Sequence, residues 1–208
     1  MAAFFSNLRN TVIAGAVIAA LLFLLYLKIQ GFDGSLDAAS FWLFLIRWLH
    51  VLCGVMWIGL LWYFNFVSTP TMPQIPAELR PALGKYITPA ALFWIRWAAM
   101  GTIVFGIILA YLNGYLLQAY TLDAIDGFTV PKSIGIGVGM WFGTIMWFNV
   151  WFLIWPAQQK ALNIGGKYPD LSADQKAAAA KTAGMFSRIN TMLSIPMLFA
   201  MVAAQNIY

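Results

Sequence analysis

The stretch SFWLFLIRWLHVLCGVMWIGLLWYFNFV, residues 40–67, decides the fold class of this protein. Arg47 and His50 are its only charged or basic residues, and nearly all the others are apolar. A helix rises about 1.5 Å per residue, so about 20 apolar residues cross the roughly 30 Å hydrocarbon core of a bilayer. The stretch is therefore long enough to span a membrane and to tilt or protrude from it.

Four further apolar runs have the length of a membrane span, near residues 11–29, 89–117, 133–155 and 188–205. Of the 208 residues, 62% are hydrophobic and 9% are charged, whereas a soluble domain is about half apolar and about a quarter charged. We therefore predict an all-α integral membrane bundle of about five transmembrane helices, with residues 1–208 as a single membrane domain. The run at 11–29 is longer than the apolar core of a secretory signal, so we predict a retained N-terminal transmembrane helix.

The distribution of basic residues predicts an orientation, because Lys and Arg are retained on the cytoplasmic side. With five spans, the N-terminus and the second and fourth connections share one face, which carries Arg9, Arg80, Lys85, Lys160, Lys167, Lys176, Lys181 and Arg188. The other face carries Lys28 and Lys132 beside Asp33, Asp37, Asp123 and Asp126. We predict a cytoplasmic N-terminus and a periplasmic C-terminus. The net charge of +5 then reflects topology and contact with anionic membrane lipids, and we expect no nucleic-acid partner.

The polar connection 158–187 contains a helix-start signal. Ser172 followed three residues later by Gln175 has the form of a capping box, and residues 176–181 are rich in alanine. We predict a short interfacial helix in this connection.

The second span carries the main candidate site. Arg47, His50 and Gly54 follow one another at three- and four-residue steps and so share a helix face. His50 as axial ligand, Arg47 on a propionate and Gly54 as room for a flat macrocycle would hold a b-type haem. The alternative is structural: His50 bonds another helix, Gly54 is a packing notch and Arg47 extends to the surface. His50 is the only histidine, so a haem here would have a methionine or nothing as its sixth ligand.

Two other features of the spans invite an interpretation. Gly135, Gly139 and Gly143 recur at four-residue spacing, which is typical of closely packed membrane helices. Arg96 lies near the cytoplasmic end of the third span, where it either contacts an acidic lipid or another anion or simply extends to the surface.

Several classes of chemistry lack the residues they need. Cys53 is the single cysteine, which excludes an internal disulfide, and with one histidine there is neither a Cys-x-x-Cys-His attachment for a c-type haem nor a His-rich zinc site. We predict no metal-ion site and no catalytic residues. All seven Asp and Glu residues lie outside the predicted spans, which argues against a proton pump or a proton-coupled carrier.

Three segments in order resemble the membrane domain of bacterial, membrane-bound, cytochrome c-linked urate oxidases, the urate oxidase N-terminal domain family. They are RWLHVLCGVMWIG at 47–59, NVWFLIWPAQQK at 149–160 and SRINTMLSIPMLF at 187–199. The resemblance covers about residues 40–205 and leaves 11–29 as an extra helix. It implies a helical domain in the bacterial inner membrane, in a family that oxidises urate and passes electrons to a fused c-type cytochrome.

The sequence departs from that family at positions that matter for chemistry. The family pattern has a histidine where Ile189 stands, another close to Gln205 or Asn206, and a histidine-glycine run after the first segment. The sequence also lacks the C-terminal c-type cytochrome. Of the family's groups, His50, Arg47 and the glycines carry over, so we do not expect this chain to oxidise urate by the family's route on its own.

These observations lead to alternative hypotheses of function. The first is an accessory or electron-relay subunit of a larger bacterial membrane redox complex, with membrane lipids and other membrane subunits as partners. The second is a membrane redox protein that binds a b-type haem through His50. The third, a carrier or sensor for a small anion, would use Arg47 or Arg96 as the counter-charge.

Overall fold

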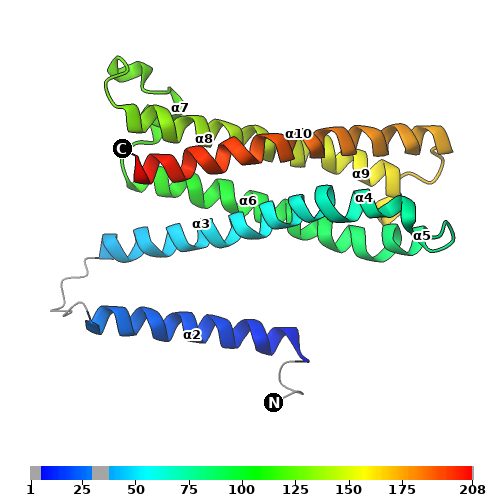
Figure 1. The fold of residues 1–208 in the computed structure, drawn as a ribbon, viewed down its shortest axis with the longest axis horizontal. Coiled ribbons are helices and arrows are strands. Elements are labelled where there is room, and N and C mark those ends of the chain that lie inside the picture. The colour runs from blue at the N-terminus through cyan, green and yellow to red at the C-terminus, as the bar shows by residue number, and fades with distance from the viewer. Residues whose placement is uncertain (1–5, 30–37, 208) are drawn as a thin grey trace. The chain divides into compact units, whose positions relative to one another are not determined.

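The computed structural model describes residues 6–29 and 38–207, and in them all regular structure is helical (Figure 1). Five helical segments of this part of the chain are long and apolar enough to cross a membrane: Leu8–Leu25, Ser40–Gln74, Arg80–Leu112, Pro131–Leu162 and Ala173–Asn206. The predicted all-α fold with five candidate spans is therefore confirmed. The last four have 32 to 35 residues each, so in a bilayer roughly a dozen residues of each would extend beyond the hydrocarbon core.

The chain divides into two compact units, residues 1–42 and 43–208. The first contains α2 (Leu8–Ile29), in which the most apolar stretch, Leu8–Leu25, buries none of its residues against protein. A helix that is apolar all round belongs in lipid when protein does not cover it. The structure thus has a helix where the extra N-terminal span was predicted.

The second unit is a bundle, and its long helices are seen in Figure 1. They are α3 (Ala38–Trp62, in this unit from residue 43), α6 (Thr88–Leu112), α8 (Pro131–Phe148), α9 (Trp155–Leu162) and α10 (Ala173–Asn206). α10 packs along α8 and α9, α6 packs on α8, and the short α7 (Leu116–Tyr120) packs on the outer part of α8. The remaining turns are α4 (Thr69–Thr71), η2 (Met72–Gln74), α5 (Arg80–Ala82), η4 (Ala124–Asp126) and η6 (Ile164–Gly166).

Three π-helical segments in the described residues interrupt the long helices: η1 (Tyr63–Ser68), η3 (Leu83–Ile87) and η5 (Asn149–Ile154). Each ends two residues before a proline, at Pro70, Pro89 and Pro156. A proline in a helix lacks an N–H and collides with the carbonyl four residues earlier, and the wider π turn relieves that collision. The fourth predicted span therefore does not stop at residue 155 but continues past Pro156 to Leu162.

Other boundaries also differ from the prediction. The second span runs to Gln74 rather than residue 67, and the third begins at Arg80 rather than residue 89. The third span ends at Leu112 rather than residue 117, because Gly114 takes a positive φ of 75° and stops the helix. The capping box is present, with Ser172 Oγ accepting from the Gln175 backbone N–H and the Gln175 side chain accepting from the Ser172 N–H. The prediction of a separate interfacial helix is wrong, because the alanine-rich run continues into the last span and the two form one helix, α10.

Side-chain hydrogen bonds join α10 to its neighbours. The Asn149 amide donates to Asn190 Oδ1 over 2.8 Å, and the Asn190 amide donates to the Met146 carbonyl over 2.9 Å. Both asparagines are buried. Since lipid tails are as apolar as leucine, helices in a bilayer associate through packing and hydrogen bonds of this kind.

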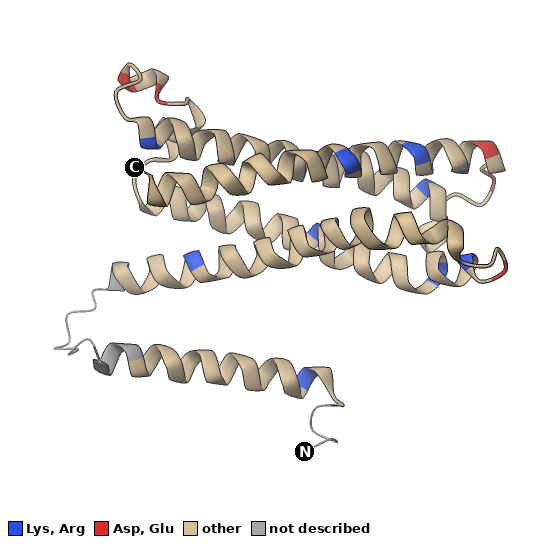
Figure 2. Cartoon of the chain, viewed as in Figure 1, with Lys and Arg blue, Asp and Glu red and all other residues tan. Residues whose placement is uncertain are grey.

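Most charged residues of the 43–208 unit lie toward its ends, as Figure 2 shows, and Arg47, Arg96 and Arg188 lie within helices. The end that holds α5 and α9 carries Arg80, Lys85, Lys160, Lys167, Lys176 and Lys181. The opposite end, near α7 and η4, carries Lys132 with Asp123 and Asp126. We refer to these as the basic end and the mixed end.

A candidate ligand cavity around His50

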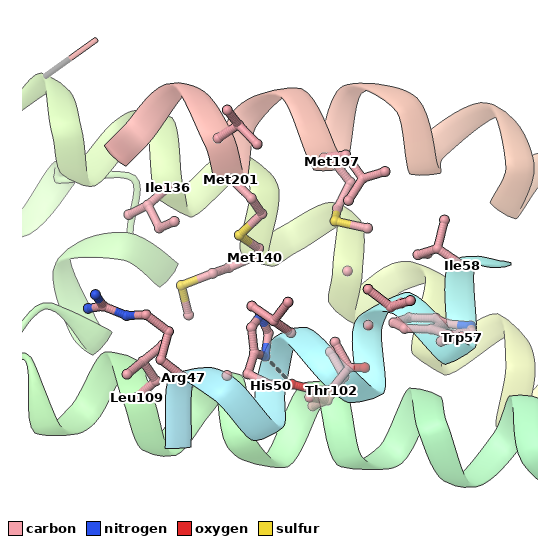
Figure 3. A pocket seen from close by; sticks show the side chains of 18 of the residues that line it. Arg47, His50, Trp57, Ile58, Thr102, Leu109, Ile136, Met140, Met197 and Met201 are labelled. Atoms are coloured by element: carbon pink, nitrogen blue, oxygen red, sulfur yellow. Dashed lines mark hydrogen bonds between the residues drawn. The ribbon is translucent and has the colours of Figure 1, made fainter. Parts of the chain in front are cut away.

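A cavity of 770 Å³ lies within the 43–208 unit, between α3, α6, α8 and α10 (Figure 3). Most of its lining is apolar, and the few polar groups come from α3, α6, α7 and the C-terminal end of α10. This size and this lining are typical of sites for small molecules and cofactors. The sequence-predicted residues His50, Arg47 and Gly54 all line it.

His50 is held in one orientation by the backbone of α6. Its Nδ1 lies 2.8 Å from the carbonyl oxygen of Thr102. A carbonyl only accepts, so Nδ1 carries the proton, and Nε2 of the neutral ring keeps its lone pair. Figure 3 shows the rest of the ring turned toward the methionines of α8 and α10. A histidine with one nitrogen on a backbone carbonyl and the other free has the arrangement of a metal-binding histidine.

Two glycines make room for this arrangement, in different ways. A Cβ on Gly106 of α6 would lie 2.9 Å from His50 Cε1 and 3.1 Å from Nδ1, so the ring occupies the space of the missing side chain. A Cβ on Gly54 would meet only Thr102 Cγ2, at 3.9 Å. Gly106 therefore permits the position of the imidazole, whereas Gly54 leaves free space on the cavity wall.

Methionines form the wall opposite His50. Met140 of α8 and Met201 of α10 direct their sulfur atoms into the cavity in Figure 3, and Met197 lies further along the same wall. Met140 and Met197 are buried. A thioether is a soft ligand that suits haem iron, so this wall offers candidates for a second ligand. Trp57, fully buried, also lines the cavity, and Trp62 lines it further toward the basic end.

The polar groups of the cavity lie toward the mixed end. In Figure 3 Arg47 extends away from His50 along the cavity. Tyr115, at the start of α7, also lines the cavity, and burial raises the pKa of its phenol while the positive charge of Arg47 lowers it by less. Tyr115 thus remains a neutral hydroxyl beside a cation. This end is suited to a carboxylate, which accepts hydrogen bonds from both groups.

The glycines of α8 do not share one role. Gly139 lies against α10, where a Cβ would come within 3.2 Å of Met201 Cε and 3.3 Å of Ala200 Cβ. Gly143 lines the cavity, with the nearest atom to its Cβ position 3.9 Å away. Gly135 is half-buried and does not line the cavity. The structure adds Gly137, where a Cβ would collide with the backbone carbonyl of Ala119 in α7.

Arg96 lies outside the cavity, in α6 and at the middle of the Arg80–Leu112 segment. Its guanidinium stacks over the Trp155 ring, with Cζ 3.4 Å from the ring centroid. Arg96 and His50 therefore belong to two separate sites.

The cavity residues that sequence reasoning missed include Thr102, Gly106, Tyr115, Met140 and Met201. Each lies on another helix than His50, and the spacing of residues within one helix carries no information about such partners. Among the described residues, no group of three or more His, Cys, Asp or Glu side chains is placed to hold a metal ion.

The comparisons with known proteins give no relative: no family model, no curated protein and no solved structure matches the chain.

Proposed function

We propose that this chain is a membrane redox protein that binds a b-type haem through His50 and relays electrons as a subunit of a larger bacterial membrane complex. The observation that carries the proposal is the orientation of His50, with Nδ1–H on the Thr102 carbonyl and Nε2 free in a 770 Å³ cavity. In metal-binding histidines, a hydrogen bond of this kind from the other ring nitrogen fixes the ring and raises its basicity.

The residues around His50 fit such a group. The apolar walls suit a macrocycle, the free space at Gly54 and Gly143 leaves room for a flat ring, and Arg47 and Tyr115 suit carboxylates at the mixed end. A bound b-type haem would supply one-electron iron chemistry. The chain itself would hold and orient the group, exclude water and set its reduction potential through the axial ligands.

The subunit role rests on the scarcity of other chemistry. Among the candidate spans of the described chain, the only Asp or Glu is Asp174, in the first turn of α10. The cavity is lined by no Asp, Glu, Lys or Cys side chain, so it lacks the carboxylates, amines and thiols that most enzymes use. Electron relay requires none of these. This fits the proposed kinship with the membrane domain of cytochrome c-linked urate oxidases, because that domain passes electrons onward.

We further propose that the basic end faces the cytoplasm of a bacterial cell, since Lys and Arg are retained on that side. Single cysteines introduced on a Cys53→Ser background by Asp170→Cys and Asp126→Cys test this orientation. A membrane-impermeant thiol reagent added from the periplasmic side should label only the second. Labelling of Asp170→Cys instead would show that the chain has the opposite orientation.

The haem proposal is tested by an absorption spectrum of the full chain purified with its native lipids. We expect the wild type to show a Soret band and His50→Ala to lack it. Added imidazole should restore the band in His50→Gly. The control variant Met56→Leu, at an exposed position of α3, should have the same band as the wild type. No Soret band in the wild type, or an unchanged band in His50→Ala, would overturn the proposal. Purification in mild detergent tests the subunit role, since recovery only as a lone monomer contradicts it.

A further inference from the structure

Arg96 is held on an aromatic platform within a membrane span. Its guanidinium carbon lies 3.4 Å from the centroid of the Trp155 ring and 5.5 Å from that of Trp151. Trp151 in turn packs edge-on against Trp97, with 5.6 Å between the ring centroids. Contact between a guanidinium and the face of an indole is a favourable cation–π arrangement, so the charged group is fixed in place by two helices.

The local helix geometry creates this platform. Trp151 lies in the π-helical η5 and Trp155 is the first residue of α9. Residues four apart are neighbours on one face of a helix. Both rings therefore face the same point on α6, where Arg96 lies.

Most of the hydrogen-bonding capacity of Arg96 is unused. Its Nε donates to the Leu92 carbonyl over 3.3 Å, while Nη1 and Nη2 have no partner in residues 6–29 and 38–207. The guanidinium presents its N–H groups in one plane as a fork that matches carboxylate and phosphate oxygens. Stacking on Trp155 occupies a face of the group and leaves the edge of the fork available.

The depth of Arg96 favours a lipid headgroup as the anion. Arg96 lies at the middle of the Arg80–Leu112 segment, 16 residues from either end. A hydrocarbon core of roughly 30 Å that begins at Leu112 covers about 20 residues, so it ends about four residues beyond Arg96. Trp94 and Trp97 beside it are more than half exposed, and exposed tryptophans gather at the level of the lipid headgroups. The side chain is half-exposed, so a headgroup can reach it.

We propose that Arg96, stacked on Trp155, binds the phosphate of an anionic membrane lipid in the leaflet at the basic end. No carboxylate of the described chain competes for the guanidinium, and the phosphate of a lipid lies at the required depth. The surrounding basic residues of that end favour an anionic headgroup over a zwitterionic one. This site is independent of the His50 cavity.

Native mass spectrometry of the full chain with phosphatidylglycerol, or with phosphatidylcholine, measures the affinity directly. We expect phosphatidylglycerol to bind about tenfold or more weakly to Arg96→Gln than to the wild type, because a charge-assisted hydrogen bond is lost. Arg96→Lys keeps the charge but not the fork and should lie between them. Lys85→Gln is the matched control, since Lys85 is at the basic end and is also near an aromatic ring, 5.3 Å from the centroid of Tyr86.

Three results would overturn the proposal. Equal affinity of Arg96→Gln and the wild type would remove the site. Equal affinity of Arg96→Lys and the wild type would reduce it to general charge attraction, and this comparison still applies if Arg96→Gln does not fold. Displacement of phosphatidylglycerol by millimolar inorganic phosphate would assign the site to a soluble anion instead of a lipid.

Discussion

Replacement of Gly106 by alanine tests the position of His50 most directly. The added Cβ would lie 2.9 Å from His50 Cε1, whereas carbon atoms in contact are about 3.5–4.0 Å apart. The ring must therefore retreat by about 0.5–1 Å. Its hydrogen bond to Thr102, now 2.8 Å, would then exceed the upper limit of about 3.2 Å for such bonds.

The expected loss of stability follows from these contacts. Overpacking costs about 1–3 kcal/mol and the lost hydrogen bond about 0.5–1.5 kcal/mol, while alanine in place of a helical glycine returns about 0.5–1 kcal/mol. Gly106→Ala should lower the free energy of unfolding by about 0.5–4 kcal/mol. The Cβ of Gly54→Ala would lie 3.9 Å from its nearest neighbour. This variant should therefore gain only about 0.5–1 kcal/mol, which alanine contributes in place of a helical glycine.

Two assays separate the effects of the two glycines. Unfolding by denaturing detergent measures stability, and haem titration followed at the Soret band measures binding. Gly106→Ala should lower both the stability and the affinity for haem. Gly54→Ala should lower the affinity for haem without lowering the stability, because its methyl group enters the cavity. If Gly106→Ala stabilises the protein as much as Gly54→Ala does, the imidazole of His50 does not lie against α6, and our reasoning about the site is refuted.

Three more predictions concern other parts of the bundle. Asn190→Ala should lower the free energy of unfolding by about 1–2 kcal/mol, because two buried hydrogen bonds are lost. The control Asn206→Ala changes an exposed residue of the same helix and should lower it by less than about 0.5 kcal/mol. Equal losses for the two variants in detergent unfolding would contradict this prediction. Of Met140→Leu and Met201→Leu, one should lower the reduction potential of bound haem, since a thioether ligand raises it, and unchanged potentials in both would exclude a thioether ligand. The pKa of Tyr115 is raised in the folded protein, chiefly by burial, so the folded state holds its proton more tightly; the stability this contributes is present below about pH 10 and is lost as pH rises through the folded pKa. Tyr115→Phe should abolish that alkaline loss, and a pH profile identical to that of the wild type would show that another group causes it.

The fold was predictable because bilayer thickness is a strong constraint. In lipid, an apolar run such as residues 40–67 can satisfy the hydrogen bonds of its own backbone only by forming a helix. The five candidate spans follow from that constraint alone. The ends of the helices were less predictable. Pro156 normally ends a helix, but η5 changes the hydrogen-bond pattern before it and the helix continues to Leu162.

The candidate site was predictable only on its own helix. Arg47, His50 and Gly54 follow from the period of α3, and they do line one cavity. The partner of His50 is a backbone carbonyl on α6, and every residue offers a backbone carbonyl. Its identity therefore depends on how the two helices are placed, which a pattern within one helix does not specify.

The location of the cavity has a physical cause in the distribution of polar contacts along α3. Toward the basic end, Trp62 donates to Ser194 Oγ and Asn65 donates to Ser187 Oγ, both over 2.8 Å, which ties α3 and η1 to α10. From residue 43 to Trp57, the structure records one side-chain hydrogen bond from α3 to another helix, that of His50 to α6. Without water there is no hydrophobic force that drives membrane helices together, so α3 can stand apart from α10 where such bonds end. The same imidazole therefore fixes one wall of the cavity and presents its free nitrogen to the space that results.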